Sequence, residues 1–91
     1  MNIIIDGSKI NDKNQFHEYI KEIMELPEYY GENLDALWDC ITGWITLPVK
    51  IEWTNYAVSK ERLGDYVDKI LETFKEAEEE LGEDFKLILE E

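Results

Sequence analysis

The chain has 91 residues, 44% of them hydrophobic, and carries 22 acidic and 9 basic side chains, which gives a formal net charge of −13. This length predicts a single domain over residues 1–91, and the apolar content excludes a disordered tail. The charge argues against nucleic acid and anionic membranes as partners and favours a basic protein.

The N-terminal part of the chain predicts a strand followed by a helix. Asn2–Ile5 is a short run rich in β-branched residues, which is typical of a buried strand. Asp12, with Gln15 three residues later, matches a capping box, and apolar residues follow at helical spacing. Pro27 biases Leu26 away from the helical conformation, so we expect the helix to end there.

A second helix is predicted over Leu34–Gly43. Gly31 suggests a turn with positive φ, and Asn33 is a good N-cap residue. Gly43 is placed to end the helix after about ten residues. The spacing produces one apolar face (Leu34, Leu37, Cys40 and Ile41) and one aromatic and acidic face (Asp35, Trp38, Asp39 and Thr42).

The second half of the chain predicts a strand over Val49–Trp53, a short helix over Tyr56–Leu63 and a final strand over Phe85–Leu89. Between the last two lies a long helix, with Asp65 as its expected N-cap and Gly82 at its end. Helical crossovers favour parallel strands. We therefore expect an α/β fold with a three-stranded parallel sheet packed against about four helices.

Few residues could support catalysis or hold a metal ion. Cys40 is the only cysteine, which excludes an internal disulfide and is typical of a reducing compartment, so we expect a cytoplasmic protein. His17 lies on the polar side of its helix and is expected to be a solvated surface residue. Asp35 and Asp39 resemble a glycosidase pair only superficially, because such pairs flank a cleft. We expect no enzyme activity, metal or cofactor.

The stretch Pro27–Trp44 combines two adjacent tyrosines, two tryptophans and several acids without a single Lys or Arg. Exposed Tyr and Trp side chains among polar groups are typical of binding hot spots. We expect one of Tyr29 and Tyr30 to pack inward and the other to project. Trp53, by contrast, lies in the middle of a strand and is expected in the core. The alternative is that the tryptophans all belong to the core.

The long C-terminal helix carries glutamates at positions 72, 76 and 80, away from its apolar stripe. An ordinary solvated helix face explains this pattern. If the helix lies beside Leu34–Gly43, however, the two acidic faces form one negative patch that attracts a basic partner.

The run from Leu26 to Trp44 resembles the barstar family, the intracellular inhibitors of the secreted ribonuclease barnase. The resemblance is long, ungapped and rich in uncommon residues, and it extends over almost the whole chain through Asp6-Gly7, His17, Pro48, Glu52-Trp53 and Phe74. Two departures concern the rim: Thr46 replaces an acid, and the segment 81–84 is one residue longer and lacks a cysteine.

The resemblance implies a barstar-like domain that plugs the active site of a basic, barnase-like ribonuclease in a 1:1 complex. Asp39 would occupy a phosphate position, Asp35 would pair with a further basic group, and Tyr29 would stack on the catalytic histidine. The alternative is an acidic module of the same fold whose basic partner is not a ribonuclease. The implied contact residues, called the plug surface below, are Tyr29, Tyr30, Gly31, Asn33, Leu34, Asp35, Ala36, Trp38, Asp39, Thr42, Gly43, Trp44, Ile45, Glu76 and Glu80.

Overall fold

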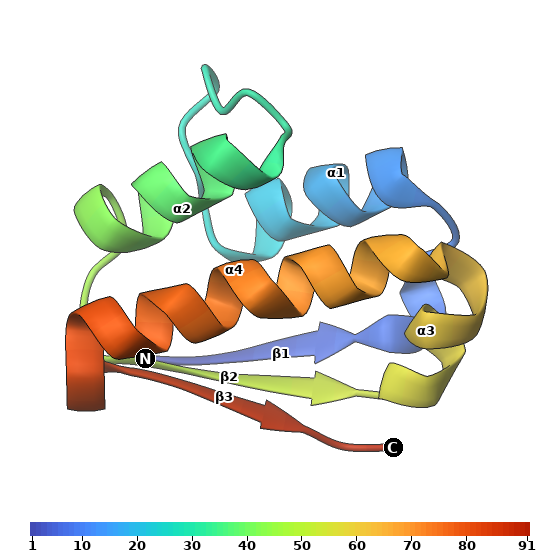
Figure 1. The fold of residues 1–91 in the computed structure, drawn as a ribbon. Helices are drawn as coiled ribbons and strands as arrows, with labels where there is room; N and C mark the ends of the chain where they lie inside the picture. The colour runs from blue at the N-terminus through green and yellow to red at the C-terminus, as the bar shows by residue number, and fades with distance from the viewer.

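The computed structural model describes residues 1–91 and contains one three-stranded sheet, with helices over one face and a short helix beyond the ends of the strands (Figure 1). The strands β1 (Asn2–Asp6), β2 (Val49–Thr54) and β3 (Phe85–Leu89) are parallel and lie in the order β1-β2-β3. The helices are α1 (Lys13–Ile23), α2 (Leu34–Gly43), α3 (Tyr56–Leu63) and α4 (Asp65–Leu81). The predicted α/β class and the parallel sheet are confirmed.

The side of the sheet that faces the helices carries the core. In register across the strands, Ile3 of β1 lies opposite Ile51 of β2, which lies opposite Leu87 of β3. Trp53 is fully buried, stacks on Phe16 and donates its indole N–H to the Ser59 hydroxyl over 3.0 Å. Its predicted place in the core is confirmed.

Helix α1 begins as the sequence predicts but ends earlier. The Asp12 carboxylate accepts a hydrogen bond from the Gln15 amide over 2.8 Å, which caps the first turn. The helix ends at Ile23, and Glu25 takes a left-handed conformation with φ of 51° before the chain reaches Pro27. The expectation that Pro27 ends the helix is therefore wrong, because the reversal at Glu25 comes first.

Two predicted turn residues are also displaced by one position. The left-handed residue before α2 is Glu32, with φ of 51°, and not Gly31. The N-cap of α4 is Gly64, so Asp65 is the first helical residue. The helix dipole stabilises its negative charge at that position as well. Gly82 has φ of 61° and ends α4 as predicted.

Two further features complete the description of the fold. The Leu47–Pro48 peptide bond, whose isomer the sequence leaves open, is cis. None of the helices combines the length and the apolar character that a membrane-spanning segment needs.

Candidate protein-binding site

Helix α2 is held by its apolar face, so its other face is free for contact. Leu37 and Ile41 are fully buried against the core and Cys40 nearly so, while Asp35 and Asp39 are exposed. The Asn33 side chain accepts from the Ala36 amide over 2.8 Å and caps the helix, as predicted. An anchored and capped helix presents its two carboxylates at fixed positions, one turn apart.

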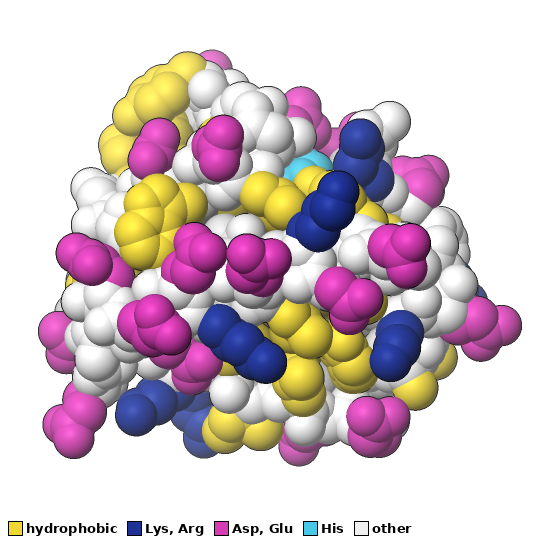
Figure 2. All heavy atoms as spheres, viewed as in Figure 1, with side chains coloured by type: hydrophobic (Ala, Val, Ile, Leu, Met, Phe, Trp, Pro, Cys, Tyr) yellow, Lys and Arg dark blue, Asp and Glu magenta, His cyan; other side chains and the backbone are white.

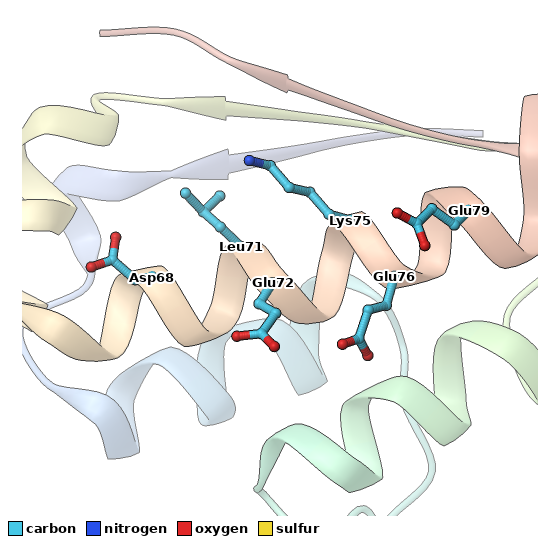
Figure 3. Close-up of a pocket in the computed structure, with 6 residues that line it drawn as sticks. All are labelled: Asp68, Leu71, Glu72, Lys75, Glu76 and Glu79. Atoms are coloured by element: carbon cyan, nitrogen blue, oxygen red, sulfur yellow. The ribbon is translucent and has the colours of Figure 1, made fainter.

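Helix α4 packs beside α2, and acidic side chains cover much of the face on which both helices lie (Figures 1 and 2). Glu72 and Glu76 extend from α4 toward α2, whereas Lys75 extends toward the sheet (Figure 3). On its outer side α4 borders an open hollow of about 540 Å³ lined by Asp68, Leu71, Glu72, Lys75, Glu76 and Glu79. The two acidic elements therefore form one negative patch.

None of the acids of this patch forms an ion pair within the protein. The only ion pair with nitrogen and oxygen within 4.0 Å joins Lys50 to Glu52 over 3.3 Å, on the sheet. Asp35, Asp39 and Glu76 are all exposed and unpaired. No ion pair therefore offsets their mutual repulsion in the free protein, and like charges gathered in this way attract positively charged groups.

The loop before α2 separates its two tyrosines as predicted. Tyr29 is 79% exposed, whereas Tyr30 is 5% exposed and belongs to the core. The Tyr29 ring meets the edge of Trp44 at 6.2 Å between ring centroids and an interplanar angle of 84°. Trp44 is itself 51% exposed, and its indole N–H donates to the Glu25 carbonyl over 3.2 Å. Two exposed aromatic rings thus support each other beside the acidic patch.

His17 is buried, so the expectation of a solvated surface histidine is wrong. Its Nδ1 lies 2.6 Å from the Tyr30 hydroxyl and its Nε2 lies 2.6 Å from the Tyr66 hydroxyl. Because the loop before α2 and the start of α4 cover this side of α1, a position that looks polar in the sequence becomes interior. The imidazole therefore ties the loop that carries Tyr29 to two helices.

Burial determines the protonation states of His17, Tyr30 and Tyr66. Desolvation lowers the pKa of His17, and the nearby Glu32 charge opposes this effect while Lys13 adds to it. Burial likewise raises the pKa of Tyr30 and of Tyr66. Near neutral pH the three groups are therefore uncharged, and both ring nitrogens of His17 have a hydroxyl partner.

The structure brings the predicted contact residues to one side but does not expose them equally. Trp38 and Thr42 are half-buried. The Thr42 hydroxyl donates to the Trp38 carbonyl over 2.8 Å, so this donor is already used within the helix. The side chain of Tyr30 is directed into the core. Exposed members are Tyr29, Gly31, Asn33, Asp35, Asp39, Gly43, Trp44, Glu76 and Glu80, and half-buried ones are Leu34, Ala36, Trp38, Thr42 and Ile45.

Sequence reasoning missed two residues that position this surface. Tyr66 and Glu25 hold His17 and Trp44, respectively, through contacts that join distant parts of the chain. Nothing local in the sequence marks either residue, because each acts only through the packing of two elements. No cluster of three or more His, Cys, Asp or Glu side chains is arranged to hold a metal ion.

Comparison with known proteins identifies the family. The sequence profile of the family described as "Barstar (barnase inhibitor)" matches residues 1–90. The chain belongs to the barstar family. A relative from Bacillus subtilis (strain 168), named "Putative ribonuclease inhibitor YrdF", is 47% identical over 88 residues, which is 97% of this chain and 97% of the relative. This barstar-family chain thus matches its relative almost end to end, and the match spans the plug surface.

Proposed function

We propose that this barstar-family protein is a non-catalytic inhibitor that binds a barnase-like ribonuclease 1:1 and covers its active site with the plug surface. The observation that carries the proposal is the pair Asp35 and Asp39, exposed on a helix whose opposite face is buried, with no basic partner of their own. Family membership supports the identity of the target.

The mechanism rests on the likeness between a carboxylate and a phosphate. Both are oxyanions that accept paired hydrogen bonds from a guanidinium group, so a ribonuclease cleft that binds RNA phosphates also binds an aspartate. Asp39 takes the phosphate position, and Asp35 pairs with a further basic group at the edge of the cleft. Tyr29, which is 79% exposed, stacks on the catalytic histidine of the ribonuclease.

The plug surface is largely formed before binding. Asn33 caps α2, Leu37 and Ile41 anchor it, and His17 holds the loop through Tyr30. Little backbone has to be ordered when the complex forms, which lowers the entropic cost of association. A rigid surface of this kind favours slow dissociation.

The acids on α4 act mainly before contact. Glu76 and Glu80 are exposed beside α2, and the net charge of −13 extends the negative field beyond the contact area. Such fields raise the association rate with a basic partner by roughly 10- to 1,000-fold at low salt. The barnase–barstar pair is itself a standard example of this effect, so the magnitude is a general one.

The test is RNA cleavage by a guanyl-preferring bacterial ribonuclease with and without the protein. We expect stoichiometric loss of cleavage. Asp39→Ala should weaken inhibition by roughly 30- to 5,000-fold, because it leaves partner arginines buried without a counter-charge. Glu61→Ala, an exposed acid of α3, is the matched control and should change inhibition less than 2-fold.

Three results would contradict parts of this proposal. If Asp39→Ala inhibits as well as the parent protein, active-site occlusion by this surface is wrong. Binding to basic proteins that have no nuclease activity, without any effect on RNA cleavage, would instead favour the acidic interaction module. Turnover of a substrate by the purified protein would overturn the non-catalytic role. We place the action of the inhibitor in the cytoplasm of the cell that makes it.

A further inference from the structure

A second hollow lies at the edge of the plug surface, where three helices meet. It has a volume of about 470 Å³. Its lining combines the start of α2 with two lysines and a tyrosine from α1 and α4: Lys13, Asn33, Leu34, Asp35, Tyr66 and Lys69. Two of the nine basic residues of a strongly acidic chain therefore line one hollow, next to Asp35.

Neither lysine is paired inside the protein. No carboxylate oxygen lies within 4.0 Å of the ammonium group of Lys13 or Lys69, although the chain carries 22 acids. Figure 2 shows Lys or Arg side chains over the region of α1, with acidic side chains around them. The hollow thus carries two positive charges against the single negative charge of Asp35, on a mainly negative side of the molecule.

The position of Lys13 is defined by its neighbours. Its ammonium nitrogen lies 5.6 Å from the centroid of the Tyr66 ring, at the distance of a cation–π contact. The Tyr66 hydroxyl is in turn hydrogen-bonded to His17 over 2.6 Å. The ring that supports the charge is therefore itself fixed by a buried group, which favours a stable geometry for the hollow.

The hollow must lie within reach of any partner that covers α2, because Asn33, Leu34 and Asp35 belong to both surfaces. A partner with only basic groups around its cleft would meet like charges at Lys13 and Lys69. Placing like charges opposite each other discriminates strongly against a partner. A partner with an acid at this point would instead gain an attractive contact.

We propose that this hollow receives an Asp or Glu side chain of the target ribonuclease, next to the basic cleft that takes Asp39. The proposal rests on the function proposed above and adds a specificity site to it. Lys13 and Lys69 bind the carboxylate from two sides, while Tyr66 forms the wall. The pair selects ribonucleases that carry an acid at this edge and disfavours those with a base there.

The experiment starts from a panel of barnase-type ribonucleases, from which the one most strongly inhibited by the parent protein is chosen. Inhibition and binding kinetics are then measured for Lys13→Gln, Lys69→Gln and the double variant. The control is Lys60→Gln, which removes the same charge from an exposed position of α3, outside both hollows and the plug surface. Thermal unfolding of each variant checks that the fold is intact.

We expect each hollow variant to weaken binding about 10-fold, chiefly through faster dissociation, and Lys60→Gln to change it less than 2-fold. Lys69→Glu should weaken binding further. A ribonuclease variant in which one acid at the rim of the cleft is replaced by Lys should then bind Lys69→Glu at least 10-fold more tightly than the unchanged ribonuclease does. The same ribonuclease variant should bind the parent protein more weakly.

Three results overturn the inference. In the first, the double variant binds as tightly as the parent protein or more tightly, which means that the lysines meet no acid. In the second, the parent protein alone binds single-stranded RNA or inorganic phosphate and the lysine variants abolish this binding, which makes the hollow a phosphate site. In the third, the parent protein inhibits no ribonuclease of the panel, and then the proposed function fails as well. In the first two results inhibition by the parent protein, and its loss in Asp39→Ala, still stand.

Discussion

The hydrogen-bonded chain Tyr30–His17–Tyr66 gives the most direct test of how the plug surface is held. Tyr30→Phe removes one hydroxyl and keeps the ring, so the core loses a hydrogen bond without losing volume. The contact is buried and short, 2.6 Å from the His17 Nδ1, and no water can replace the hydroxyl without a cavity. A buried polar atom left without a partner costs about 1–3 kcal/mol, and we expect the upper half of that range.

Tyr66→Phe is the matched comparison within the same chain of contacts. Its bond to the His17 Nε2 is equally short, 2.6 Å, but only partly buried, so solvent can take over the role of the lost hydroxyl. We therefore expect a cost of about 1 kcal/mol, near the lower end of the same range. The two variants differ only in the surroundings of the hydroxyl that is removed.

The assay is urea unfolding at pH 7.5, followed by far-ultraviolet circular dichroism. With slopes of about 1–3 kcal/mol per molar urea, Tyr30→Phe should lower the midpoint by roughly 1 M and Tyr66→Phe by clearly less. If Tyr30→Phe stays within about 0.5 kcal/mol of the parent protein, His17 does not hold the loop. If Tyr66→Phe lowers the free energy of unfolding more than Tyr30→Phe does, solvent does not replace the Tyr66 hydroxyl and the reasoning from burial is wrong.

Three further predictions concern pH, packing and steering. The pKa of His17 is lowered in the folded state, so below about pH 6.5 the unfolded chain takes up a proton that the folded chain refuses. As the pH falls from 6.5 to the lower folded-state pKa, the free energy of unfolding decreases by up to about 1.4 kcal/mol per pH unit, and above pH 6.5 this group makes no difference. Urea unfolding at pH 5.5 and 7.5 should show a smaller pH dependence for His17→Gln than for the parent protein. Leu37→Ala empties a fully buried site under α2 and should cost about 2–5 kcal/mol in the same measurement, with a result below 1 kcal/mol excluding its role as an anchor. Glu76→Gln should slow association with the ribonuclease at low salt and leave dissociation unchanged, as stopped-flow binding can measure; an effect confined to dissociation would contradict steering.

The parts of the fold that depend on short-range chemistry could be predicted from the sequence. The caps at Asp12 and Asn33 each act on a backbone amide three residues later, so the relevant partners are adjacent in the chain. Helix α4 and the burial of Trp53 follow from regular spacing of apolar residues. These features need no knowledge of which elements meet in space.

The features that sequence reasoning missed arise where separate elements meet. His17 lies on the polar side of α1, and only the covering loop and α4 make it interior. Lys13 and Lys69 lie on different helices and become neighbours of one hollow only when α1 and α4 pack beside α2. Burial and neighbourhood at such points depend on tertiary packing, which periodicity within a single helix does not encode.

The exposed aromatic pair offers a last test, because it should act as a unit. Tyr29 contacts the edge of Trp44 at 6.2 Å, and Trp44 is fixed by its bond to the Glu25 carbonyl. Trp44→Ala removes the support of the Tyr29 ring as well as its own contact area. Measured by inhibition of the target ribonuclease, the losses in Tyr29→Ala and Trp44→Ala should overlap, so the double variant loses about 0.5–1.5 kcal/mol less than their sum. Strictly additive losses would mean that each ring meets the ribonuclease independently, and the edge contact in the free protein would then not prepare the surface for binding.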